Sequence, residues 1–217
     1  MDAALRARLA EIAGDASIAG EAVSPITAEQ VEQVCLACAE AGTRIAVSSG
    51  PATAAKPPAG AVLVSLGGID PVDVDLDRLI VRAGAGATLA AVRQAAEKKG
   101  LTITGAGPAA AADVRIGEAV ARGQFSRRSL TGIEAVLPGG GRVAAGGAVL
   151  KDVAGYDLIG ALLGSRGRLA LITAVTFRLQ PAGVAQEPSE AAGTPRPVLG
   201  DALEVAFDPE RLLAARS

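Results

Sequence analysis

The sequence predicts an α+β fold built from two α/β subdomains, the first over about residues 24–105 and the second over about residues 106–181. Strand-like and helix-like segments alternate through the first range, which is typical of a small α/β unit. The second range contains a hairpin pattern and a long β-rich run. The chain has 217 residues, of which 50% are apolar, so it is long enough for one large or two small domains.

Apolar spacing and helix-end signals mark the elements of the N-terminal half. Residues 2–13 have the spacing of a short amphipathic helix. Thr27 is expected to cap a second helix, because Gln30 completes a capping-box pattern and Gly42 marks the end. Three strands and a third helix are expected at residues 44–47, 61–65, 80–82 and 88–98.

Strand patterns dominate the second subdomain. Residues 133–137 and 142–145 are expected to pair as a hairpin, because the segment 138–141 between them is a turn signal of one proline and three glycines. A short helix is expected over residues 157–163. Residues 169–179 form one long β-rich run.

The C-terminal part of the chain has a different composition. Residues 182–200 are rich in proline, alanine, glycine and glutamate, which indicates a linker. Asp208 and Pro209 are typical of a helix N-cap and a first-turn proline. A last helix is therefore expected over residues 210–215.

The composition excludes several classes of function. No histidine is present, which removes Ser-His-Asp and Cys-His catalysis together with the commonest metal ligand. A formal charge of −2, with both signs interspersed, gives no reason to expect nucleic acid or an anionic membrane as partner. No apolar run has the length of a membrane span and the N-terminus does not read as a signal peptide, so a cytoplasmic protein is expected.

Cys35 and Cys38 form a Cys-x-x-Cys pair, which is compatible with a redox function. They also continue a helical apolar stripe that begins at Val31 and Val34. Core packing is the preferred interpretation, because free cysteine is often a small buried apolar residue and two cysteines alone make a poor metal site. No metal site is expected.

The most specific segment of the chain is residues 146–158, which read GGAVLKDVAGYDL, followed by LGSRG at residues 163–167. It resembles the corresponding segment of the FAD-binding subunits of glycolate oxidase. These belong to the large family that binds FAD in the fold of vanillyl-alcohol oxidase and para-cresol methylhydroxylase (PCMH). Three further segments resemble the family in the right order, at residues 26–47, 76–103 and 202–213.

The resemblance implies a PCMH-type FAD-binding domain over residues 1–181, with the cap domain missing. Family members carry a cap domain that covers the flavin ring and supplies much of the substrate pocket. Here only residues 182–200 occupy its place, as a linker. Residues 201–217 are then a C-terminal segment that packs back on the FAD-binding domain.

The resemblance also implies where FAD is contacted. The pyrophosphate is expected at the loop over residues 47–53, because backbone amides in such a loop form an anion-binding nest. In this loop Val47 stands for a glycine and adds a branched side chain. Pro51 lacks an N–H group.

A second FAD contact is expected at residues 115–118. Glu118 replaces a glycine of the family and puts a carboxylate near the pyrophosphate, which costs like-charge repulsion. Arg115 is expected to offset this charge, either by pairing with Glu118 or by meeting the phosphates. Further on, Arg168 and Ala170 stand for a usual threonine and glycine.

A set of positions retains residues suited to FAD binding. The candidate cofactor-binding residues are Ser48, Ser49, Gly50, Thr53, Gly117, Lys151, Gly155, Tyr156, Asp157, Gly164 and Ile172. A flavin would be bound non-covalently, because there is no histidine to link it and both cysteines lie on the apolar stripe. No candidate for a catalytic base is found. A purely structural role for residues 151–157 stays open, since glycines permit unusual backbone angles and a lone tyrosine can anchor a core.

The implied function is that of the FAD-binding subunit of a glycolate oxidase-like, 2-hydroxy-acid dehydrogenase complex whose flavin site is partly degenerate. FAD would take a hydride from the hydroxy acid and pass the electrons on. The expected partners are a larger flavoprotein subunit, an iron–sulfur subunit or both, and any membrane association would come through them. The alternative is a non-catalytic interaction subunit that kept the fold, lost FAD and docks on an intact flavoprotein or iron–sulfur subunit.

Overall fold

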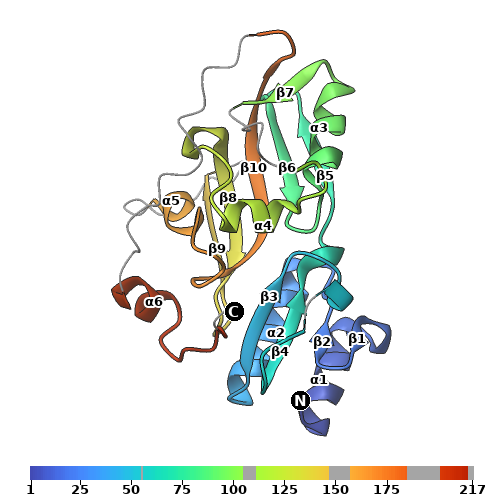
Figure 1. The fold of residues 1–217 in the computed structure, drawn as a ribbon, viewed down its shortest axis with the longest axis vertical. Coiled ribbons are helices and arrows are strands. Elements are labelled where there is room, and N and C mark those ends of the chain that lie inside the picture. The colour runs from blue at the N-terminus through green and yellow to red at the C-terminus, as the bar shows by residue number, and fades with distance from the viewer. Residues whose placement is uncertain (55, 105–110, 147–156, 185–200, 215–217) are drawn as a thin grey trace.

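Two β-sheets, each with its own helices, follow one another along the long axis of the molecule (Figure 1). The computed structural model describes residues 1–217 except 55, 105–110, 147–156, 185–200 and 215–217. None of the helices that it describes is both long and apolar enough to cross a membrane.

The first sheet has the strand order β1-β2-β4-β3. The elements of this half are α1 (Ala3–Ala13), β1 (Ile18–Ala19), β2 (Ala22–Val23), α2 (Ala28–Glu40), β3 (Arg44–Ser48) and β4 (Ala61–Ser65). β2 and β3 both run parallel to β4, and all five residues of β4 are buried. An uninterrupted apolar strand is typical of a parallel sheet that is covered on both faces.

Helix α2 begins and packs largely as its sequence predicts. The Thr27 hydroxyl accepts a hydrogen bond from the N–H of Gln30 at 3.1 Å. The Gln30 side chain accepts from the N–H of Ile26 at 2.8 Å, one residue before the position of a full capping box. Cys35 and Cys38 lie in the buried stripe of this helix, which confirms their packing role. Burial raises the pKa of both thiols, that of Cys38 to about 11, so both stay protonated at neutral pH.

The second sheet is antiparallel, with the order β5-β6-β10-β8-β9 and β7 paired to the end of β10. Its elements are β5 (Val72–Asp75), β6 (Ile80–Gly84), α3 (Leu89–Glu97), β7 (Leu101–Ile103), α4 (Ile116–Ala121), β8 (Leu130–Val136), β9 (Arg142–Gly146), α5 (Leu158–Leu162) and β10 (Leu171–Pro181). The sequence did not predict β5, β7 or α4, which are three to six residues long. Short elements carry too few periodic positions to be recognised.

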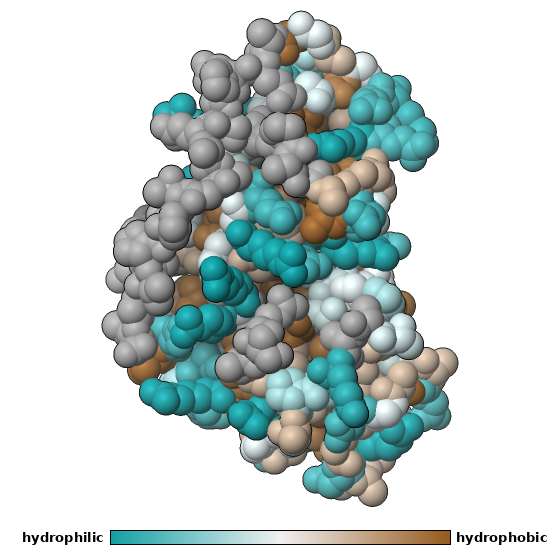
Figure 2. All heavy atoms as spheres, viewed as in Figure 1, coloured by the Kyte–Doolittle hydropathy of each residue, from teal (hydrophilic) through white to brown (hydrophobic). Residues whose placement is uncertain are grey.

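The sheets divide the chain between β4 and β5 and not after residue 105 as the sequence predicts, because β5, β6 and β7 belong to the second sheet. These two halves, called the first and second subdomains below, share part of their core. Leu171 of β10 and Val136 of β8 pack in one buried cluster with Val34 of α2 and Val64 of β4. On the described part of the face shown in Figure 2, hydrophilic and hydrophobic residues are interspersed, and hydrophobic ones are visible near the middle of the molecule. The junction is therefore a packed apolar contact between subdomains.

The C-terminal segment corrects one sequence expectation. The helix expected over residues 210–215 is wrong, and the helix present is α6 (Asp201–Phe207). The buried Asp208 carboxylate accepts the N–H groups of Leu212 and Leu213, each at 2.8 Å, which closes a turn. Ile45 then donates its N–H to the Leu212 carbonyl at 2.6 Å. The chain is extended here because β3 is an edge strand with unpaired backbone groups that it can satisfy.

Candidate functional site

Three candidate cofactor-binding residues meet at the junction of the two subdomains. Ser49 directly follows β3, Gly117 lies in the first turn of α4, and Ile172 lies near the start of β10. They border a cavity of about 20 Å³, called the junction cavity below. Its other lining residues are Val47, Leu66, Glu118, Ala121, Gly167 and Ala170.

Gly117 is required by close packing. A methyl group at this position would lie 2.6 Å from the Ser49 Oγ and 2.8 Å from the Ala85 Cβ. The Gly117 N–H donates to the Ala85 carbonyl at 2.9 Å, which holds α4 against the end of β6. Glycine therefore lets the two subdomains approach each other at this point.

Ser49 offers a hydroxyl to a ligand. The residue is 7% exposed, and within the described parts of the chain its hydroxyl has no hydrogen-bond partner. The side chain lines the junction cavity. A hydroxyl in this position can donate to an anionic oxygen.

The other candidate residues of the expected pyrophosphate loop do not border the junction cavity. The Gly50 N–H already donates to the Ser48 hydroxyl at 3.2 Å, and the Gly50 carbonyl accepts from the Ser65 hydroxyl at 2.8 Å. Thr53 lies in a short 3₁₀ turn and lines a different cavity, together with Glu21 and other residues of the first subdomain. Of the four candidates in this loop, only Ser49 borders the junction cavity.

Glu118 lines the junction cavity. Its carboxylate pairs with Arg122 at 2.7 Å and not with Arg115, because positions four residues apart lie on one side of a helix. The Arg115 guanidinium donates to the Gly86 carbonyl instead. Of the two alternatives for Arg115, pairing with Glu118 is therefore wrong, and a contact with the phosphates stays a prediction.

The other altered positions are accommodated by packing. Val47 lines the junction cavity and packs against the shared core, so its branched side chain fills space that a glycine would leave open. Ala170 is 1% exposed at the same wall. Arg168 forms an ion pair with Glu204 of α6, which ties the C-terminal segment to the turn before β10.

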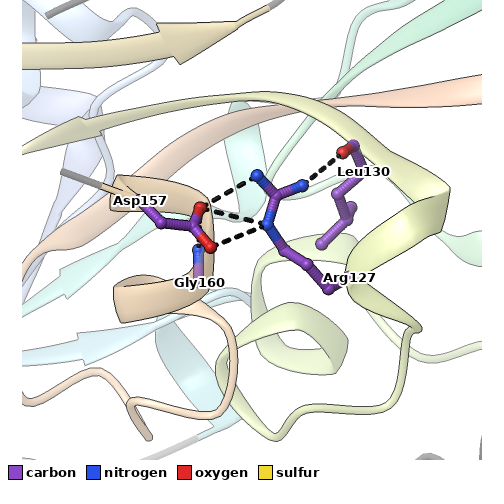
Figure 3. Close-up of polar contacts among 4 residues, drawn as sticks. All are labelled: Arg127, Leu130, Asp157 and Gly160. Atoms are coloured by element: carbon purple, nitrogen blue, oxygen red, sulfur yellow. Dashed lines mark hydrogen bonds and ion pairs between the residues drawn. The ribbon is translucent and has the colours of Figure 1, made fainter. Parts of the chain in front are cut away.

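Asp157 has partners of its own in the second subdomain. It caps α5 by accepting the Gly160 N–H at 2.9 Å, and it pairs with Arg127 (Figure 3). Gly164 follows α5 with a φ of +80°, which favours glycine, and donates its N–H to Val120 at 2.9 Å. Neither residue borders the junction cavity.

The three remaining candidates, Lys151, Gly155 and Tyr156, lie outside the residues that the structure describes. Two glycines for which the sequence predicted no role shape the junction. A methyl group on Gly67 would lie 2.8 Å from the Gly50 carbonyl oxygen, and one on Gly86 would lie 2.5 Å from that of Gly67. Glycine permits such a close approach because it has no side chain, but the sequence does not indicate which backbone it meets.

Comparisons with known proteins point to one family. A family model described as "FAD binding domain" matches residues 21–152. An uncharacterized FAD-linked oxidoreductase of Mycobacterium tuberculosis is 30% identical over 183 residues, which is 79% of this chain and 40% of that protein. D-lactate dehydrogenase of Archaeoglobus fulgidus is 35% identical over 119 residues, 51% of this chain and 26% of that one. A glycolate oxidase subunit of Bacillus subtilis is 41% identical over 56 residues, 26% of this chain and 12% of that one.

Solved structures share the fold. Alkyldihydroxyacetonephosphate synthase superposes with a TM-score of 0.61 at 18% identity, over 76% of this chain and 32% of that chain. The chain spans about 40% of the length of the M. tuberculosis relative. The expected PCMH-type fold is confirmed by these neighbours. Since the family model matches more than half of the sequence, the chain belongs to the FAD binding domain family, whose cofactor is FAD.

Proposed function

We propose that the chain is the FAD-binding part of a 2-hydroxy-acid dehydrogenase of the glycolate oxidase type. It would work in a complex with a larger flavoprotein subunit, an iron–sulfur subunit or both. The observation that carries the proposal is the meeting of Ser49, Gly117 and Ile172 at one cavity. Similarity to a D-lactate dehydrogenase and to a glycolate oxidase subunit supports the substrate class.

The residues at the junction would suit the pyrophosphate of FAD. Ser49 supplies an available hydroxyl, and Gly117 leaves the facing wall free of a side chain. A volume of about 20 Å³ holds no more than one water-sized group, so the cofactor would lie along the mouth of the junction cavity. Bound FAD supplies a two-electron acceptor for the hydride of a 2-hydroxy acid. Ser49 would donate to a phosphate oxygen, while Arg122 would limit the repulsion from Glu118.

The proposal includes the domain arrangement that the sequence resemblance implies. Residues 1–181 would form the FAD-binding domain, and residues 182–200 would stand in place of the cap. Phe207 packs against the main core of the second subdomain, and Ala214 donates its N–H to the Ile45 carbonyl at 2.7 Å. These contacts support a closing segment that returns to the FAD-binding domain. A partner subunit would then supply the substrate pocket and any catalytic base.

The test begins with the visible spectrum of the purified protein and a titration of FAD. Ser49→Ala should weaken FAD binding by about tenfold, because a hydrogen bond to a charged group contributes roughly 1.5–3 kcal/mol. Ser24→Ala is the matched control, since Ser24 does not border the junction cavity. Equal binding by wild type and Ser49→Ala would contradict the placement of FAD at this cavity.

A second measurement tests the need for a partner. A dye-reduction assay with glycolate or D-lactate and added FAD should show no turnover by the chain alone. Turnover at about 1 s⁻¹ or more, which is ordinary for an enzyme, would contradict the proposed dependence on other subunits. If no FAD binds under any condition, the alternative of a non-catalytic interaction subunit replaces the proposal.

A further inference from the structure

A cavity of about 640 Å³ lies at the end of the second sheet, where β8 begins and β9 ends. In the described part of the chain, it shares no lining residue with the junction cavity. Its volume is in the range of small-molecule binding sites. We call it the arginine cavity. It is lined by Arg127, Arg128, Leu130, Thr131, Ala145, Gly146, Asp157, Leu158, Ile159 and Arg178.

The described lining of the arginine cavity is positive in a chain whose formal charge is −2. Among the residues that the structure describes, three arginines line the cavity against one aspartate. Arg127 forms an ion pair with Asp157, in which Nη2 lies 2.9 Å from Oδ1. Within the described residues, the guanidinium groups of Arg128 and Arg178 have no carboxylate partner. Two cationic side chains are thus available to a ligand.

Arg127 holds the frame of this cavity in place. Its Nε donates to both Asp157 oxygens, at 3.0 and 3.1 Å, and its Nη1 donates to the Leu130 carbonyl at 3.0 Å (Figure 3). These contacts join the start of β8 to the start of α5. Arg128 is the next residue in the same short 3₁₀ turn, so its backbone is anchored while its side chain is exposed. A fixed backbone leaves only the side chain of Arg128 to be ordered when a ligand binds.

The rest of the wall is largely apolar, with Leu130, Ala145, Leu158 and Ile159 as its main side chains. A guanidinium binds a carboxylate through two parallel hydrogen bonds. We infer that the arginine cavity binds a small molecule with a carboxylate and an apolar body, the carboxylate at Arg128 and Arg178. A bare phosphate would engage the arginines and leave the apolar wall unused.

Isothermal titration calorimetry of the full chain with octanoate tests this inference. Octanoate should bind saturably. Octanol has the same body without the charge, and inorganic phosphate has the charge without the body, so each should bind at least tenfold more weakly. Arg128→Gln and Arg178→Gln should each weaken octanoate binding about tenfold, which is the effect expected for one lost charge-assisted contact. Arg93→Gln, in α3 and outside the lining of this cavity, is the matched control.

Several results would overturn the inference. One is equal binding of octanoate by the wild type and by the Arg128→Gln/Arg178→Gln double variant, with circular dichroism showing that both are folded. Another is octanol binding as tight as that of octanoate, which would make the site purely apolar. A third is phosphate binding as tight as that of octanoate, which would make it a simple anion site. The double variant should bind FAD with the same affinity as the wild type. A failure of the carboxylate-binding inference can therefore be told apart from a failure of the proposed flavin function.

Discussion

Arg127 and Asp157, thirty positions apart in the sequence, are joined by an ion pair in which Nη2 lies 2.9 Å from Oδ1. The same carboxylate caps α5 through the Gly160 N–H at 2.9 Å. One side chain therefore performs two tasks: it begins a helix and ties that helix to the start of β8 (Figure 3). The pair is about half exposed, with 43% and 51% of the two side chains accessible.

Substitutions at Asp157 should separate these two tasks. Asp157→Asn keeps an oxygen for the cap and loses the ion pair, so unfolding should become easier by less than about 1 kcal/mol. Asp157→Ala also loses the cap and should cost about 1 kcal/mol more. Urea denaturation measures both. Equal losses for the two variants would show that the cap contributes nothing. Arg127→Gln should cost more than Asp157→Asn, because it also removes the Nη1 hydrogen bond to the Leu130 carbonyl.

Gly117→Ala should destabilise the junction. The added methyl group would lie 2.6 Å from the Ser49 Oγ, and overpacking of this kind costs about 1–3 kcal/mol. Ser49→Ala removes one of the two colliding atoms, so the double variant should recover part of the loss. Gly139→Ala is the control, because a methyl group there meets nothing within 4 Å. Thermal unfolding that shows no coupling between positions 49 and 117 would contradict the close approach.

Glu118→Gln should tighten FAD binding by about fivefold. The carboxylate lines the junction cavity, and its partner Arg122 is 58% exposed, so solvent weakens the compensation. A gain of about 1 kcal/mol corresponds to this ratio. Arg122→Gln should act in the opposite direction, and Glu97→Gln in α3 should have no effect. Quenching of flavin fluorescence gives the affinities, and unchanged binding in all three variants would remove Glu118 from the cofactor site.

The buried thiols predict a loss of stability at high pH. Burial raises the folded-state pKa of Cys38 to about 11 and that of Cys35 further, while an exposed thiol has a pKa near 8.5. The stabilisation is complete below about pH 8.5 and falls as the pH rises toward about 11, because the unfolded chain loses its protons first. Cys35→Ala/Cys38→Ala should show a smaller decline in the free energy of unfolding over this range. An equal decline in both proteins would assign the effect to other groups.

Denaturation should release all of a bound flavin, because none of it is covalently attached to the protein. The sequence contains no histidine, and both cysteines are buried in α2. Acid precipitation should leave all yellow colour in the supernatant. Flavin fluorescence that travels with the denatured chain on a gel would refute this.

Local signals were enough for much of the fold. Thr27 caps the second helix as expected, through the N–H of Gln30. The helix expected over residues 88–98 is also present, and Thr88 caps it through the N–H of Ala91. The hairpin of β8 and β9 follows its proline and glycine turn. Asp208 was expected to cap a helix, and its carboxylate does accept backbone N–H groups. It closes a turn instead of a helix, since the edge of β3 competes for the same backbone.

The site depended on tertiary structure. The sequence alone was enough to predict the cap of α2, the helix α3, the turn at residues 138–141 and the long strand β10, and to recognise the family segment at residues 146–158. Each of these features depends on residues that are close together in the chain. Only the tertiary structure shows that Ser49 meets Gly117 while Thr53 lies at a different cavity. The meeting of Ser49 and Gly117 depends on how α4, at the second sheet, packs against the end of β3 in the first. Such packing is set by the volumes of side chains far apart in the chain, which no local pattern records.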